Sequence, residues 1–166
     1  MPQEKIILTN TEPGLNTDSD QLALIILDRL GLMSRKKGAQ VKIERVLLQL
    51  YELQKEATRE KDPTKAIMTV EDMALYAGIT RQTMYDYLKR WLLIDFITKT
   101  SFVSSDKKVV IGYKLNGSTI ENAFERARKK INNNLDVTQK YIVELQKSIK
   151  NEKISQSINQ NKTEQN

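Results

Sequence analysis

Apolar side chains recur at three- and four-residue spacings in the first third of the chain and predict two helices. The helix at 39–60 carries Ile43, Val46, Leu47, Leu50, Leu53 and Ala57 on one face. The helix at 20–30 is apolar nearly all round, so we expect it to be buried on more than one side, in a core or against a second subunit. A strand formed by ALIIL is the alternative for the same residues. Between the helices, SRKKG at 34–38 predicts a basic turn.

Residues 69–91, TVEDMALYAGITRQTMYDYLKRW, predict two short helices joined by a tight turn. Threonine is favoured at the N-cap of a helix, so Thr69 and Thr80 mark the starts of the two helices. Gly78 suits the sharp turn between them because glycine adopts backbone conformations that other residues avoid. A small residue at Ala74, the glycine four positions later and an apolar residue at Met84 form a helix-turn-helix signature. The inner face of the second helix, 80–91, is completed by Leu88 and Trp91.

Two stretches rich in β-branched and aromatic residues follow, at 96–103 and 109–115, with turn residues at 104–108 between them. A helix-turn-helix followed directly by a hairpin resembles the winged-helix family, and YLKRWLLIDFITK resembles the passage from that family's recognition helix into its first wing strand. The resemblance covers roughly residues 40–115. It implies a mostly α fold with a small β-hairpin wing.

A single apolar stripe on residues 119–153 predicts a long C-terminal helix. The small domain is too short to cover this stripe, so we expect coiled-coil pairing with a second copy of the chain. The alternative is a helix that folds back over its own domain, and INNNL at 131–135 is a weak point where the helix could break. The residues expected to pair are Ile120, Phe124, Ala127, Ile131, Leu135, Ile142, Leu145 and Ile149.

These patterns divide the chain into four parts. Residues 1–17, with two prolines and a glycine, predict a mobile lead-in. The winged helix-turn-helix domain with its extra N-terminal helix spans 18–117, and the dimerisation helix spans 118–153. The polar, low-complexity residues 154–166 predict a disordered tail.

Composition narrows the possible chemistry. The chain has no cysteine and no histidine, which excludes disulfides, Cys/His zinc sites and Ser-His-Asp or Cys-His catalysis. It also lacks a glycine-rich phosphate loop, so we expect no enzyme activity, no cofactor and no metal. The net charge of +6 suits an anionic partner such as nucleic acid or a membrane surface. The N-terminus lacks a signal-peptide pattern and the apolar runs are too short for a membrane span, so we expect a cytoplasmic, nucleoid-associated protein.

The winged-helix resemblance implies that the 80–91 helix enters the major groove of DNA. Its outward residues would be the contacts, with Arg81 suited to guanine, Gln82 to adenine, and Lys89 and Arg90 to the backbone. Tyr85 would contact DNA or pack under the wing, and a solvated face is the alternative for the whole set. The expected contacts are Thr80, Arg81, Gln82, Thr83, Tyr85, Lys89 and Arg90, with Lys107 and Lys108 at the wing tip.

A winged helix followed by a dimerising C-terminal helix resembles PadR-like and related transcriptional regulators of bacteria and archaea. The resemblance implies a homodimer that binds double-stranded DNA in a sequence-specific way and regulates transcription. DNA binding for plasmid or chromosome segregation, replication or chromosome organisation is the first alternative. A winged-helix protein-interaction module without nucleic acid is the second.

Overall fold

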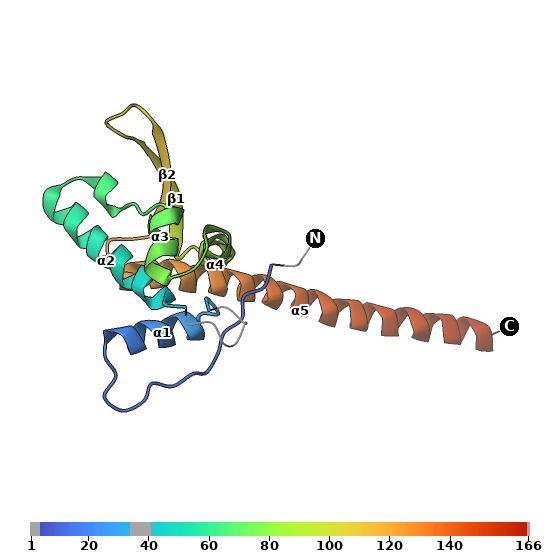
Figure 1. Cartoon of the computed structure of the whole chain (residues 1–166). Helices are drawn as coiled ribbons and strands as arrows, with labels where there is room; N and C mark the ends of the chain where they lie inside the picture. Colours follow the sequence, from blue (N-terminus) through green and yellow to red (C-terminus); the bar gives the residue numbers. More distant parts are fainter. Residues whose placement is uncertain (1–3, 34–40, 166) are drawn as a thin grey trace. The chain divides into compact units, whose positions relative to one another are not determined.

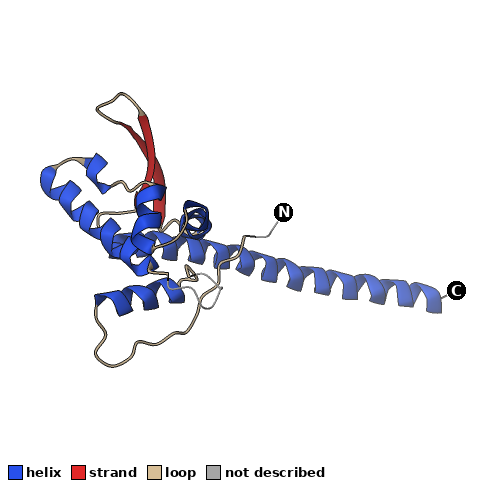
Figure 2. Cartoon of the chain, in the orientation of Figure 1, coloured by secondary structure: helices blue, strands red, loops and turns tan. Residues whose placement is uncertain are grey.

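The helices and strands follow the order that the sequence predicts (Figures 1 and 2). The computed structural model describes residues 4–33 and 41–165, so the predicted basic turn at 34–38 lies outside the described residues. The chain divides into two compact units, Met1–Arg128 and Lys129–Asn166. The elements are α1 (Ser19–Arg29), α2 (Ile43–Glu60), the 3-10 helix η1 (Pro63–Ala66), α3 (Val70–Ala77), α4 (Arg81–Leu93), β1 (Ile97–Val103), β2 (Val109–Leu115) and α5 (Ile120–Glu164). The predicted fold class, mostly α with one hairpin and a long C-terminal helix, is confirmed.

The β-hairpin is joined to the segment that precedes α3. β1 and β2 are antiparallel, and their register runs from Ile97 opposite Leu115 to Val103 opposite Val109. On the other edge of β2, Met68 bridges Tyr113 through two backbone hydrogen bonds of 2.8 Å. Met68 therefore occupies the position of a third, very short strand. A helix, a bridging residue, two more helices and a hairpin make a winged-helix-like topology.

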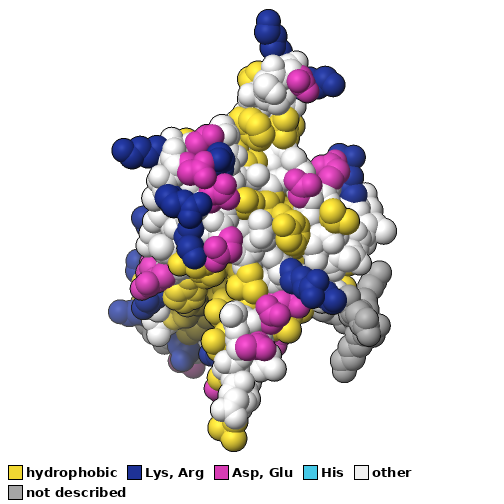
Figure 3. Space-filling model, turned by 60° about the vertical axis from the view of Figure 1, so that its left-hand side comes forward, with side chains coloured by type: hydrophobic (Ala, Val, Ile, Leu, Met, Phe, Trp, Pro, Cys, Tyr) yellow, Lys and Arg dark blue, Asp and Glu magenta, His cyan; other side chains and the backbone are white. Residues whose placement is uncertain are grey.

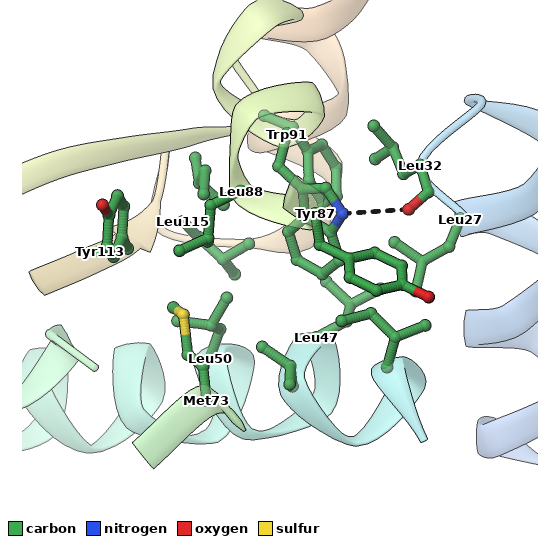
Figure 4. Packing of buried hydrophobic residues seen from close by; sticks show 14 of the residues in the cluster. Leu27, Leu32, Leu47, Leu50, Met73, Tyr87, Leu88, Trp91, Tyr113 and Leu115 are labelled. Atoms are coloured by element: carbon green, nitrogen blue, oxygen red, sulfur yellow. Dashed lines mark hydrogen bonds between the residues drawn. The ribbon is translucent and has the colours of Figure 1, made fainter. Parts of the chain in front are cut away.

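One hydrophobic core is shared by the helices of the first unit and the hairpin. Trp91 of α4 is fully buried, and its ring meets Phe96 edge to face, with centroids 5.9 Å apart. Its Nε1 donates to the Leu32 carbonyl oxygen, just after α1, at 3.3 Å (Figure 4). Leucines from α2 and β2, among them Leu47 and Leu115, complete the same cluster. Burial of these side chains is the main source of stability for the domain.

The extra N-terminal helix α1 begins at an Asp18 cap, whose carboxylate accepts from the Gln21 N–H at 2.9 Å. The strand alternative for this segment is therefore wrong. Ala23 and Leu27 are buried, whereas Leu22 and Ile26 on the same helix are exposed. The expectation of burial on more than one side is thus met only in part within this chain.

The described part of the predicted mobile lead-in lies along the end of α1. The Thr9 N–H donates to the Arg29 carbonyl at 3.1 Å, and the Arg29 guanidinium donates to the Thr11 carbonyl at 2.8 Å. The prolines and glycine of this segment predict turns. They do not indicate that its backbone will form hydrogen bonds with Arg29, which lies about twenty residues further along the chain.

Helix α5 is continuous through INNNL and runs to Glu164, beyond Lys153, where the sequence predicts disorder to begin. Neither glycine nor proline follows Gly117, so no residue after it breaks the ladder of backbone hydrogen bonds. The Thr119 side chain accepts from the Asn122 N–H at 3.0 Å and caps the start of the helix. In the first unit, Ala123 and Ala127 of this helix are buried in the domain core.

The close approach of Met68 to β2 requires a glycine at position 112. A Cβ there would lie 2.6 Å from the Met68 carbonyl oxygen and would also overlap the Ile67 side chain. We therefore expect Gly112→Ala to lower the free energy of unfolding by about 1–3 kcal/mol, the usual cost of overpacking. Urea unfolding followed by circular dichroism measures it. Gly14→Ala is the control, because a Cβ at Gly14 meets nothing within 4 Å. Equal stability of the two variants would contradict the account.

Candidate nucleic-acid interface

The turn between α3 and α4 is built by a glycine and a threonine, as the sequence predicts. Gly78 ends α3 in the left-handed conformation, at φ 70°, which costs a glycine little. Thr80 has extended backbone angles, and its hydroxyl accepts from the Thr83 N–H at 3.2 Å. This cap satisfies a backbone donor that the helix itself leaves without a partner. The two hydroxyls of Thr80 and Thr83 lie 2.9 Å apart, so both residues belong to the cap.

Helix α4 separates a buried face from an outer face. The buried residues are Met84, Tyr87, Leu88 and Trp91. Arg81, Gln82 and Lys89 are exposed, while Tyr85 is half-buried beside them. At 3.6 residues per turn these four fall within about a third of the helix circumference. The structure therefore brings four of the predicted contacts together on one surface, called here the outer face of α4.

The Arg81 guanidinium is held by two neighbours. Its Nε lies 3.2 Å from Glu71 Oε1 on α3, and its Nη2 donates to the Tyr85 hydroxyl at 3.2 Å. The hydrogen bond to Tyr85 and then the charge of Glu71 raise the pKa of Arg81, so the group stays cationic. These contacts use two of the five N–H donors of a guanidinium. The remaining donors suffice for a bidentate hydrogen bond.

Glu71 is a residue of this site that sequence reasoning missed. It lies on α3, while Arg81 begins α4, and the pair forms only because of the angle at which the two helices cross. Neither the spacing nor the composition of the sequence signals such a pair. Tyr85 also lies near Tyr113 of the hairpin, whose pKa is raised by burial and then by Tyr85.

Arg90 lies apart from the outer face of α4. Its Nη1 donates to the Met33 carbonyl oxygen at 2.5 Å, and its Cζ lies 5.8 Å from the centroid of the Tyr87 ring. Positions 81 and 90 are about two and a half helical turns apart, so their side chains point in opposite directions. The predicted role of Arg90 at the DNA backbone is therefore not supported by its position, which connects α4 to the segment after α1.

The tip of the hairpin carries the other predicted contacts. Lys107 has a φ of 60°, its N–H donates to the Ser104 carbonyl at 2.9 Å, and both it and Lys108 are exposed. Figure 3 shows basic side chains at the top of the wing and hydrophobic side chains below them. Val103 and Val109, which are paired across the hairpin next to its turn, are 67% and 69% exposed.

The residues predicted to pair two chains fall into two groups. Ala127 is fully buried in the domain's own core, and Ile120 packs half-buried against the same core. Ile131, the first of the predicted residues in the second unit, is half-buried. Phe124 is more exposed, at 37%. In the second unit, Leu135, Ile142, Leu145 and Ile149 are all exposed on α5.

No family model, curated protein or solved structure matches this chain significantly. Among the described residues, no group of three or more aspartates and glutamates is arranged to hold a metal ion. Within the same part of the chain, no helix has the length and apolar character needed to cross a membrane.

The Thr80 cap sets where α4 begins, so its loss has a measurable cost. We expect Thr80→Ala to lower the free energy of unfolding by about 1 kcal/mol, because the Thr83 N–H loses its acceptor. Thr80→Ser keeps an acceptor in the same place and should retain most of the stability. Thermal and urea unfolding of the two variants compare them directly. Equal losses in both would show that the hydroxyl is not the source of the effect.

Proposed function

We propose that this protein binds double-stranded DNA, with the N-terminal half of α4 in the major groove. The observation that carries the proposal is the outer face of α4, which presents Arg81, Gln82 and Lys89 on one side of the helix. Its position at the start of a helix that follows a tight turn is the one from which helix-turn-helix proteins contact base edges. The positive charge there attracts phosphate, which supplies most of the affinity of such complexes.

The chemistry of each residue indicates what it would contact. Arg81 keeps enough free donors to bind O6 and N7 of a guanine, while its contacts with Glu71 and Tyr85 position the guanidinium. The amide of Gln82 matches N6 and N7 of an adenine. Lys89, about two turns further along α4, suits a phosphate. Lys107 and Lys108 would contact the backbone or the minor groove from the wing.

We further infer that the protein acts as a homodimer and regulates transcription in the cytoplasm, at the nucleoid. The inference of a dimeric regulator is supported by the winged-helix-like topology and the long C-terminal helix. The same order of domain and helix is found in PadR-like transcriptional regulators. Two copies would offer two recognition helices to two half-sites. Segregation, replication or chromosome organisation would use the same DNA-binding face.

A second candidate function is a protein-interaction module. It is favoured by apolar side chains that the domain leaves exposed, namely Leu75 on α3, at 80%, and the Val103 and Val109 pair on the wing. Exposed apolar groups close together often mark a surface that contacts another protein. In this case the cationic residues on α4 and the wing would have no nucleic-acid role.

Two substitutions separate base recognition from backbone contact. We expect Arg81→Ala to weaken binding of the preferred duplex by about 1–3 kcal/mol and to relax the preference at one base pair. Lys107→Gln should weaken all duplexes alike and reduce the slope of log K against log salt concentration by about one, because one phosphate contact is lost. Fluorescence-anisotropy titrations at several salt concentrations measure both quantities.

Lys55→Gln is the matched control, since it makes the same charge change on α2, where Lys55 contacts Glu52 and Tyr51. It should leave both affinity and salt slope nearly unchanged. If Arg81→Ala and Lys107→Gln both behave like this control, the proposed DNA-binding face is wrong. If the unmodified protein binds no duplex even at low salt, the protein-interaction module becomes the better account.

A further inference from the structure

The second unit has an apolar seam that follows a heptad repeat. Its residues are separated by steps of four, three, four, three and four along α5, and they are Ile131, Leu135, Thr138, Ile142, Leu145 and Ile149. Thr138 is the one polar member, and its hydroxyl donates to the Asn134 carbonyl at 3.1 Å. Leu135 is 61% exposed and Leu145 is 59% exposed. A repeat of 3.5 residues keeps a seam facing one partner helix over its whole length, which is the pattern of a left-handed coiled coil.

The seam lies further along α5 than the residues with which the helix packs in its own domain. The domain core takes up Ala123 and Ala127, in the first turns of the helix. From Ala127 the apolar positions advance by two successive steps of four, to Ile131 and then Leu135. Such a stutter shifts the apolar stripe around the helix. The heptad pattern therefore starts only after the residues that the domain uses.

We propose that this seam binds a second copy of the chain in a parallel, in-register, two-stranded coiled coil. In heptad terms Leu135, Ile142 and Ile149 are at a positions, and Ile131, Thr138 and Leu145 at d positions. Ile142 and Ile149 at a, with Leu145 at d between them, are the combination that favours parallel dimers, whereas Ile131 at d and Leu135 at a are the reverse. The orientation therefore rests on the C-terminal layers. The proposal rests on the homodimer of the proposed function and adds its orientation and its register.

The residues that flank the seam favour a second copy over a different partner. The e and g positions next to the core layers carry no charge through residue 148, and they are Asn132, Asn134, Gln139, Tyr141, Gln146 and Ser148. Charged e and g residues normally select the partner and its direction. Through residue 148, two identical helices meet no like-charge repulsion at these e and g positions, and the same positions offer no charge to attract an oppositely charged helix.

A parallel arrangement has a consequence for the protein as a whole. Each domain is attached to the N-terminal end of its own α5, so a parallel coil attaches both domains at the same end. An antiparallel coil would attach them at opposite ends of the seam, which is about 27 Å long at 1.5 Å per residue. Closely spaced half-sites on DNA therefore require the parallel form or a different interface.

The absence of cysteine from the chain allows a direct test with single introduced cysteines. Glu152 is the next d position and is exposed, whereas Asn151 is exposed one residue earlier and points away from the seam. We expect Glu152→Cys to form a disulfide-linked dimer under mild oxidation without DNA, and Asn151→Cys to form little. Non-reducing electrophoresis measures the yield. Equilibrium sedimentation of the unmodified chain at micromolar concentration should give twice the mass of 19.2 kDa.

Three outcomes would overturn the proposal. The first is a monomer in sedimentation. The second is equal cross-linking of the Glu152→Cys and Asn151→Cys variants. The third is cross-linking only when Ile131→Cys and Ile149→Cys chains are mixed, which indicates an antiparallel coil. Because these measurements contain no DNA, their failure is distinct from a failure of DNA binding, which the duplex titrations report separately.

Discussion

The burial of Trp91 is the constraint on which the position of α4 depends. Its ring fills the space between α4 and Phe96, and its Nε1 is satisfied by the Leu32 carbonyl, so the indole has one orientation that leaves no buried donor without a partner. Because a helix is rigid, fixing its inner face also fixes its outer face. Arg81 and Gln82 owe their outward direction to a tryptophan two to three turns away along the same helix.

Much of the fold could be predicted because its signals are local. β2 has the predicted bounds, and Gly78 and Thr80 perform the turn and cap functions expected of them. What could not be predicted depends on contacts between segments distant in sequence. Met68 joins β2, Glu71 reaches Arg81, and Arg90 turns to Met33, each through packing that no spacing encodes. The composition of residues 154–166 predicts disorder, yet without glycine or proline they remain helical through Glu164.

The two parts of α5 differ in what their apolar side chains contact. Alanines at 123 and 127 let the helix approach the domain core closely, and Ile120 packs against the same core at the start of the helix. Larger aliphatic residues predominate at the apolar positions from Ile131 onward. Helix α4 also has two different surfaces. Apolar residues form its buried face, and ionisable or amide side chains form its outer face. On α4 the buried face anchors the helix and the outer face carries the proposed contact with DNA. On α5 the first turns anchor the helix and a later segment carries the proposed contact with a second chain.

The central claim is that the outer face of α4 and the wing tip form a DNA-binding surface. Its most direct test is selection of duplexes from a random-sequence pool by the purified full-length chain, followed by binding titrations of the selected DNA at low and moderate salt. We expect an enriched, two-fold symmetric sequence whose affinity for the protein falls steeply as salt increases. No retained DNA at low salt, or retention without any enriched sequence, would contradict sequence-specific recognition by α4.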